Sequence, residues 1–123
     1  EKLKDLYPMA YDCTCMHEFV MSLEKFHKEN NVSALDVAKA LLDFGIHPPT
    51  MYFPLIVSEA LMVEPTETES RETLDDAIAA FRKIYDSIIN SPASVSASPV
   101  TTPMRRLDEV KAAREPVLKY EFS

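Results

Sequence analysis

Apolar and polar residues alternate with two different periods along the chain, and the pattern predicts five core elements. Residues 16–23 alternate with a period of two, which is typical of a β-strand that covers a core with one face. Apolar residues recur at helical spacing over 34–44 and 71–90, which predicts two amphipathic helices. Two short apolar runs, 51–57 and 60–64, predict strands joined by a tight antiparallel connection. The order strand, helix, strand, strand, helix predicts an α+β fold with a small, mainly antiparallel sheet and helices on one face.

Capping residues mark the ends of both predicted helices. Ser33 is placed to cap the first helix, with Asp36 three residues later as its capping-box partner. Gly45, the only glycine in the chain, is placed to end that helix in a left-handed conformation. Ser70 is the expected N-cap of the second helix, where acidic residues gather and match the helix dipole. Pro54 lacks an amide donor, so its run is expected to be an edge strand or irregular.

The remaining segments lack a clear period. The polar segment 24–31 is expected to be a loop, and the Ser-, Ala- and Pro-rich segment 91–103 is expected to be a linker or a surface strap. Pro103 is placed to begin a short helix, which needs a partner surface because so short a helix is unstable alone. We therefore divide the chain into an α+β domain at 1–90, the linker, and a short helix with a C-terminal tail at 104–123.

Composition and charge argue against several classes of protein. The net charge of -7 argues against nucleic-acid binding, which needs a basic face. No apolar run approaches the roughly 20 residues of a membrane span. The single glycine leaves no glycine-rich phosphate-binding loop. The N-terminus has neither an initiator Met nor an apolar leader, which is typical of the middle of a longer chain. Cys13 and Cys15 are too close for an unstrained disulfide and are expected to be free thiols in a reducing compartment, the cytoplasm.

Four polar residues are the candidates for a pocket or an interface. His17 and His47 are candidates because histidine is the residue type most often used for acid-base chemistry, and His47 falls in a predicted loop, where functional residues often collect. Glu18 adjoins His17, and Glu64 lies in an apolar strand, where a buried carboxylate would need a partner. The ordinary alternative is a hydrogen-bonded structural histidine or a solvated charge. No nucleophile and base can be paired from spacing alone, so this stretch is not predicted to be a self-sufficient enzyme.

Cys13, Cys15 and His17 form a C-x-C-x-H pattern of soft metal ligands. On a strand, all three side chains would point to one face. A closed zinc site needs a fourth ligand and usually a turn between its cysteines, so no metal site is expected. The alternative is that Cys15 packs within the strand and His17 is a hydrogen-bonded residue of the sheet.

Several long runs of sequence resemble a known enzyme family. They are CMHEFVMSL, ALDVAKALLDFGIHPPTMYFPL and ALMVEPTETESRETLDDAIAAF. These runs are similar to the C-terminal region of glycine dehydrogenase (decarboxylating), the P-protein of the glycine cleavage system. The run TTPMRRLDEVKAAREPVLKY resembles the end of its subunit 2 in organisms that divide the protein between two chains. The resemblance covers nearly the whole chain, and its H-x-P-T-x-x-x-P and L-M-V-E-P-T-E-[ST]-E motifs are long and specific.

The resemblance implies an enzyme of the pyridoxal-phosphate fold type I, in which a small α+β C-terminal domain packs beside a large cofactor-binding domain. The family decarboxylates glycine and passes the aminomethyl group to the lipoyl arm of H-protein, and subunit 1 is its other partner. The cofactor lysine belongs to the large domain, and none of the eight lysines here lies in a matching motif. We therefore expect no catalytic, cofactor-binding or metal-binding residue in this fragment, and no activity from it alone. An exposed apolar face is expected where the large domain belongs, and it also offers a surface for a homo-oligomer.

A second hypothesis is a stand-alone regulatory module of ferredoxin-like type, such as an amino-acid-binding ACT domain. Its β-α-β-β-α-β order requires a last strand, and residues 117–122 are the only candidate for it. Fold analogy alone does not establish function, so the resemblance to glycine dehydrogenase is the first hypothesis.

Overall fold

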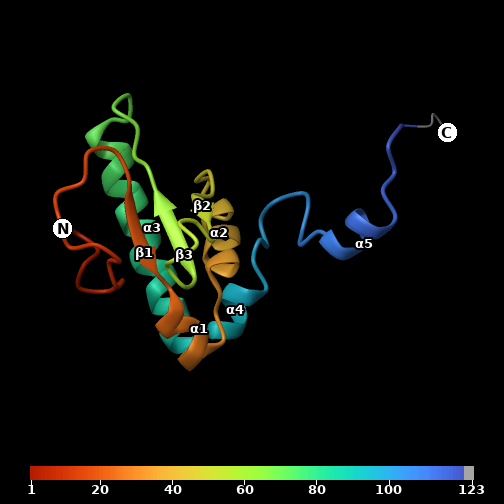
Figure 1. The fold of residues 1–123 in the computed structure, drawn as a ribbon, viewed down its shortest axis with the longest axis horizontal. Helices are drawn as coiled ribbons and strands as arrows, with labels where there is room; N and C mark the ends of the chain where they lie inside the picture. The colour runs from red at the N-terminus through yellow and green to blue at the C-terminus, as the bar shows by residue number, and fades with distance from the viewer. Residues whose placement is uncertain (121–123) are drawn as a thin grey trace.

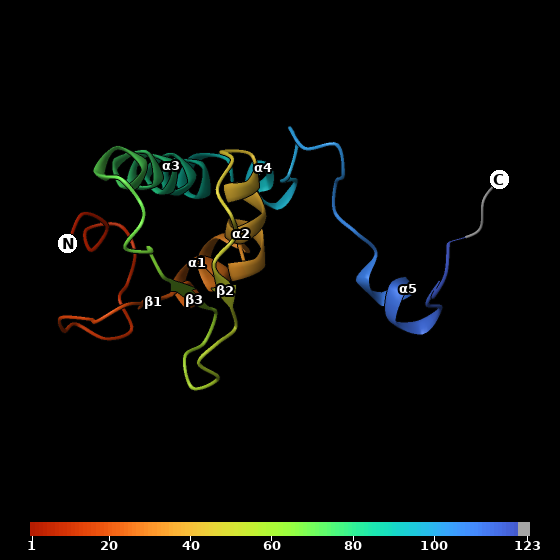
Figure 2. The same ribbon diagram turned by 90° about the horizontal axis from the view of Figure 1, so that it is seen from above.

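The computed structural model describes residues 1–120 and contains a three-stranded antiparallel sheet. In chain order the elements are β1 (Phe19–Ser22), α1 (Glu24–Asn30), α2 (Ala34–Leu42), β2 (Thr50–Met51), β3 (Ala60–Val63), α3 (Arg71–Asn90), α4 (Pro92–Ser96) and α5 (Glu109–Arg114). The strand order is β1-β3-β2. Figures 1 and 2 show α1 to α4 on one face of the sheet and α5 apart from it. The predicted α+β class is confirmed.

The strand register decides which residues enter the core. Met21 of β1 pairs with Leu61 of β3, and both are fully buried in the core that the helices cover. Val20 pairs with Met62, and because side chains alternate along a strand, these two point to the opposite face. No helix among residues 1–120 packs on that second face (Figure 2).

The N-terminal segment is part of the core. Tyr7 is fully buried, and its hydroxyl donates a hydrogen bond of 2.8 Å to the Phe81 carbonyl in α3. Burial raises the pKa of this hydroxyl, which therefore stays protonated as a donor. The Tyr7 ring meets the rings of Phe26, Phe81 and Tyr85 edge to face, with centroids 5.7 to 5.9 Å apart. These contacts attach the segment before β1 to α1 and α3.

Residues 8–10 run along the outer edge of β1. The Ala10 amide donates a hydrogen bond of 2.8 Å to the Val20 carbonyl. The last strand of a ferredoxin-like module would lie at this edge, beside the first strand. Residues 117–120 form no strand, and Phe122, which belongs to the same predicted strand, lies outside the described residues. The occupied edge argues against the ferredoxin-like alternative.

The predicted helix caps are confirmed. The Ser33 hydroxyl accepts a hydrogen bond of 3.2 Å from the Asp36 amide, and the Asp36 carboxylate accepts one of 2.8 Å from the Ser33 amide. The helix ends at Leu42, two residues earlier than predicted, and Gly45 has the expected positive φ of 72°. The second predicted helix spans the predicted residues, with Ser70 as its N-cap.

Replacement of Gly45 tests this helix end. We expect Gly45→Ala to lower the free energy of unfolding by about 1 to 2 kcal/mol, because a side chain disfavours the left-handed conformation by that amount. A Cβ at this position would meet no atom of the described residues within 4 Å, so the cost is conformational and not steric. Urea denaturation measures the change. Gly45→Asn is the matched control and should lower the free energy of unfolding by less, because asparagine tolerates the left-handed conformation. Equal losses for both variants would contradict the explanation.

Two predictions around β1 are wrong. The strand predicted at 16–23 begins only at Phe19, and the residues before it form an irregular loop. The segment 24–31, predicted to be a loop, contains α1. This helix buries one aromatic residue, Phe26, and Asn31 follows it with a positive φ of 55°. Seven residues are too few to show a helical period, so packing of the aromatic side chain decides the conformation.

The connection between β2 and β3 is longer than predicted. β2 has only two residues, and loop 52–59 replaces the predicted tight turn. Tyr52 and Glu59 stand at the two ends of the loop with positive φ values of 57° and 48°. Pro54 lies within the loop, and β2 is an edge strand, in agreement with the prediction for this run.

The segment predicted as a linker or strap, 91–103, begins as a helix. α4 packs against α2 and α3, and its Val95 is buried (Figure 1). The predicted C-terminal helix exists as α5, but it starts at Glu109 instead of near Pro103, with Asp108 as its N-cap. The division into domains remains a prediction. No helix in residues 1–120 is long and apolar enough to cross a membrane.

Candidate functional site

The uncovered face of the sheet contains a hollow of about 290 Å³. It is lined by residues of two strands and two loops: Tyr11, Cys13, Cys15, Glu18, Phe19, Val20, Phe53, Pro54 and Met62. Val20 and Met62 form an apolar floor because they pair across the sheet on the side away from the helices. The rim is more polar, with one carboxylate and two thiols. An exposed apolar floor of this kind is typical of a surface that contacts another protein or domain.

Two loops extend this surface with exposed apolar side chains. Loop 52–59 projects away from the sheet on the side opposite the helices (Figure 2), and its Leu55 and Ile56 are each 86% exposed. Met16, in loop 10–18, is 89% exposed. Apolar side chains that gather on one side of a domain are typical of an interaction site. We call the hollow together with these two loops the open face.

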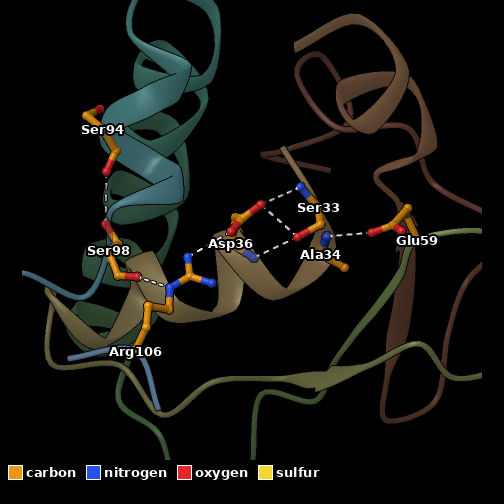
Figure 3. A network of polar contacts seen from close by, with 7 residues as sticks. All are labelled: Ser33, Ala34, Asp36, Glu59, Ser94, Ser98 and Arg106. Carbon is orange, nitrogen blue, oxygen red and sulfur yellow. Dashed lines mark hydrogen bonds and ion pairs between the residues drawn. The ribbon is translucent and has the colours of Figure 1, made fainter. Parts of the chain in front are cut away.

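A carboxylate attaches loop 52–59 to the helical layer. Glu59 accepts a hydrogen bond of 2.7 Å from the Ala34 amide at the first turn of α2 (Figure 3). A carboxylate is favoured at this position because the helix N-terminus has unpaired amides and a positive dipole end. The contact fixes the end of the loop that forms part of the open face.

The four predicted site residues lie at one end of the sheet. β1 and β2 begin at this end and β3 finishes there, because the strands are antiparallel. His17 and Glu18 precede β1. His47 precedes β2, and Glu64 follows β3. All four side chains are exposed, and within residues 1–120 none of them forms a hydrogen bond or ion pair through its side chain. Their common location therefore does not assemble a catalytic group.

The structure changes the interpretation of these residues one by one. Glu18 is the one candidate among the four that lines the hollow. Glu64 lies beyond β3 and is exposed, so the buried partner expected for it is not required. His17 and Cys15 lie in a loop and are exposed, so the predicted strand geometry of the C-x-C-x-H pattern is wrong. Residues 1–120 contain no cluster of three or more His, Cys, Asp or Glu side chains arranged to hold a metal.

The open face does not fit the pyridoxal phosphate that the family resemblance implies. This cofactor is held as an imine on a lysine amine. The chain has eight lysines, all in its described part, and none of them lines the hollow. The floor of the hollow is apolar, and a cofactor phosphate would need hydrogen-bond donors there. No step of the chemistry is therefore assigned to these residues.

A polar network that sequence reasoning missed holds residues 98–106 along α2, and we call this segment the strap. Arg106 donates a hydrogen bond of 2.8 Å from its guanidinium to the Asp36 carboxylate and another to the Ser98 carbonyl (Figure 3). The Asp36 carboxylate thus serves both the capping box of α2 and the strap. The partners are 70 residues apart in sequence, so local patterns do not reveal the contact.

Asp43, just after α2, holds the beginning of the strap. Its carboxylate accepts hydrogen bonds from the Val100 amide at 2.7 Å and from the Thr101 amide and hydroxyl at 2.7 and 2.8 Å. Burial raises the pKa of this carboxyl, but the hydrogen bonds outweigh burial and hold the pKa below its usual value. The strap is therefore held at neutral pH, and the contribution is lost as the pH falls through the lowered pKa. Asp43 lies at the C-terminal end of α2, where a negative charge is unfavourable because it opposes the helix dipole. This unfavourable placement is the feature of the sequence that could have indicated a separate role for Asp43.

Comparison with known proteins identifies the family. Residues 1–105 match the family described as glycine dehydrogenase, C-terminal domain. The chain is 55% identical to the probable glycine dehydrogenase (decarboxylating) subunit 2 of Fervidobacterium nodosum over 98% of this chain and 25% of that protein. It is 56% identical to the protein of the same name from Treponema denticola, over the same shares. The chain thus spans about a quarter of the length of these curated relatives. Because the family match covers residues 1–105 of the 123, the chain belongs to the glycine dehydrogenase C-terminal domain family.

Proposed function

We propose that this chain is the C-terminal small domain of subunit 2 of a glycine-decarboxylating enzyme. The observation that carries the proposal is the match over residues 1–105, together with identity above 50% to relatives named subunit 2. In the whole protein, pyridoxal phosphate is bound by a lysine outside this chain, and glycine is the substrate. Subunit 1 and lipoylated H-protein are the partners, and H-protein accepts the aminomethyl group. The two exposed free thiols, Cys13 and Cys15, agree with a cytoplasmic location.

The role of the domain in that enzyme is to cover the cofactor-bearing domain. The open face supports this role, because its floor and its loops expose apolar side chains that gain stability when water is removed from them. Glu18 borders the hollow and is the candidate residue nearest to this interface. His17, His47 and Glu64 lie along the adjoining end of the sheet, where they serve as secondary contacts.

Titration with pyridoxal phosphate tests the proposal. The full-length polypeptide that carries this chain is expected to develop a saturable imine absorption band at one equivalent of cofactor. It is also expected to release carbon dioxide from glycine when subunit 1 and lipoylated H-protein are present. The 123-residue chain alone is expected to do neither, because none of its lysines lines the hollow.

The shape of the titration curve separates specific from adventitious binding. Surface lysines form weak imines whose absorbance rises without saturation. A saturable stoichiometric band from the 123-residue chain alone would overturn the assignment of the cofactor to another domain. A full-length protein that forms no such band and releases no carbon dioxide from glycine would overturn the enzyme assignment itself.

A further inference from the structure

Glu18 is the carboxylate of loop 10–18 that has no partner within the described chain. The loop contains one other carboxylate, Asp12, which pairs with the Lys4 amine at 2.5 Å. Glu18 forms no hydrogen bond or ion pair through its side chain within residues 1–120, and it lines the hollow of the open face. No lysine, arginine or histidine of the described residues lines that hollow. Glu18 therefore places an uncompensated carboxylate there.

Three aromatic side chains share the hollow with Glu18. Tyr11, Phe19 and Phe53 come from loop 10–18, β1 and loop 52–59, and the fold brings them together. Tyr11 is 50% exposed and Phe53 is 53% exposed, so both remain available for contact. Aromatic rings attract cations because the faces of the rings carry partial negative charge. Rings beside a carboxylate therefore favour a cation over a neutral or anionic group.

The floor of the hollow indicates which kind of cation fits. Val20 and Met62 make the floor apolar. Lysine and arginine combine a long apolar stem with a charged head. The stem matches the floor, and the head matches the rim beside Glu18. The volume of about 290 Å³ is at the small end of the range of ligand sites, about 300 to 1,000 Å³, which suits a single side chain.

Covering the open face makes such a cation necessary. In the proposed function, the cofactor-bearing domain covers this face and removes water from Glu18. A carboxylate that loses water without gaining a partner is strongly unfavourable. The covering surface must therefore supply a group of opposite charge. The net charge of -7 on the chain also favours a basic surface as its neighbour.

The length of the relatives favours a cation from the same polypeptide. The chain spans about a quarter of the length of these proteins. A protein of that length attaches about three times as many further residues covalently to this domain. Attachment through a short linker gives an effective concentration of the order of millimolar, so a contact within the polypeptide is favoured over one with a separate protein.

We propose that the hollow binds one lysine or arginine side chain from the cofactor-bearing domain of the same polypeptide, and that Glu18 pairs with its charged head. This inference rests on the proposed function, in which that domain covers the open face. Glu18 acts in docking and has no part in the chemistry. It also sets the register of docking, because any other alignment removes water from Glu18 without supplying a partner.

The reaction of Cys13 and Cys15 with N-ethylmaleimide measures whether the hollow is covered, because both thiols are exposed and line it. The full-length polypeptide is labelled without its companion subunit, and the labelled peptides are quantified by mass spectrometry. When docking is fast compared with labelling, the rate follows the fraction of undocked molecules. We define protection as the rate in the 123-residue chain divided by the rate in the full-length protein. Protection of at least about tenfold is expected, which corresponds to about 90% docked molecules.

Variants of Glu18 test the charge pair. Glu18→Gln is expected to lower protection by about tenfold or to abolish it, because the cation would be buried without its partner. Glu18→Lys should lower protection at least as much, because it opposes two like charges. Glu29→Gln is the matched control, since it neutralises an exposed carboxylate on α1 and should change protection by less than about twofold. Each variant is also labelled as the 123-residue chain, so direct effects of charge on the thiols cancel in the ratio.

The outcomes separate this inference from the proposed function. Unchanged protection in both Glu18 variants would overturn the inference and leave the covering role intact. Absence of protection in the unmodified full-length protein would overturn the covering role and the inference together. Protection that appears only after the companion subunit is added would overturn the assignment of the cation to the same polypeptide. The imine titration on the same samples reports separately whether the enzyme assignment stands.

Discussion

Tyr7→Ala is expected to lower the free energy of unfolding by about 3 to 5 kcal/mol, the usual cost of removing a large buried aromatic side chain. The Tyr7 ring is fully buried and joins the N-terminal segment to α1 and α3 through three edge-to-face contacts. Its removal leaves a cavity and also removes the hydrogen bond from the hydroxyl to the Phe81 carbonyl. Because domains are stable by only about 5 to 15 kcal/mol, the variant should be partly unfolded near physiological temperature. Urea denaturation followed by circular dichroism measures the change.

Two substitutions separate the contributions of Tyr7. Tyr7→Phe keeps the ring and removes the hydroxyl, so it should lose about 1 kcal/mol, the net value of a typical hydrogen bond. Tyr11→Ala removes the same side chain at a position that is 50% exposed and should lose much less than Tyr7→Ala. Equal losses at Tyr7 and Tyr11 would show that the N-terminal segment is not part of the core.

Under the proposed function, Met62→Asp is expected to inactivate the full-length enzyme while leaving the isolated domain folded. In the isolated domain, Met62 faces the hollow, so a carboxylate there stays hydrated and costs about 1 kcal/mol or less. In the full-length protein, docking of the cofactor-bearing domain would bury that charge without a partner, at a cost of about 3 kcal/mol or more. This cost corresponds to a decrease of roughly 100-fold in the docked fraction. Carbon dioxide release from glycine should fall accordingly.

Matched variants make this result specific to the open face. Met62→Leu keeps the apolar volume and should retain activity. Ala79→Asp adds the same charge on an exposed position of α3 and should also retain it. If Met62→Asp released carbon dioxide at the rate of the unmodified enzyme, the open face could not be the surface that covers the cofactor-bearing domain.

Local signals were sufficient where an element is long or has complete caps. α3 begins after Ser70 and extends over 20 residues, so its apolar period is repeated more than five times. The capping box and Gly45 define α2 from contacts within a few residues. The candidate site was less predictable. His17, Glu18, His47 and Glu64 were chosen by residue type, but their common end of the sheet follows from strand register, which no single segment encodes.

The sequence by itself determined the class of fold, the two long helices and the membership of the family, because periodicity, capping and long motifs are local. Only the tertiary structure decided that Tyr7 enters the core, that one face of the sheet stays open, and that the strap is held on α2. These features depend on contacts between segments far apart in the chain, such as Tyr7 with Phe81 and Asp36 with Arg106. Short elements such as α1 acquire their stability from such contacts and not from intrinsic propensity, so their conformation appears only when the whole domain is assembled.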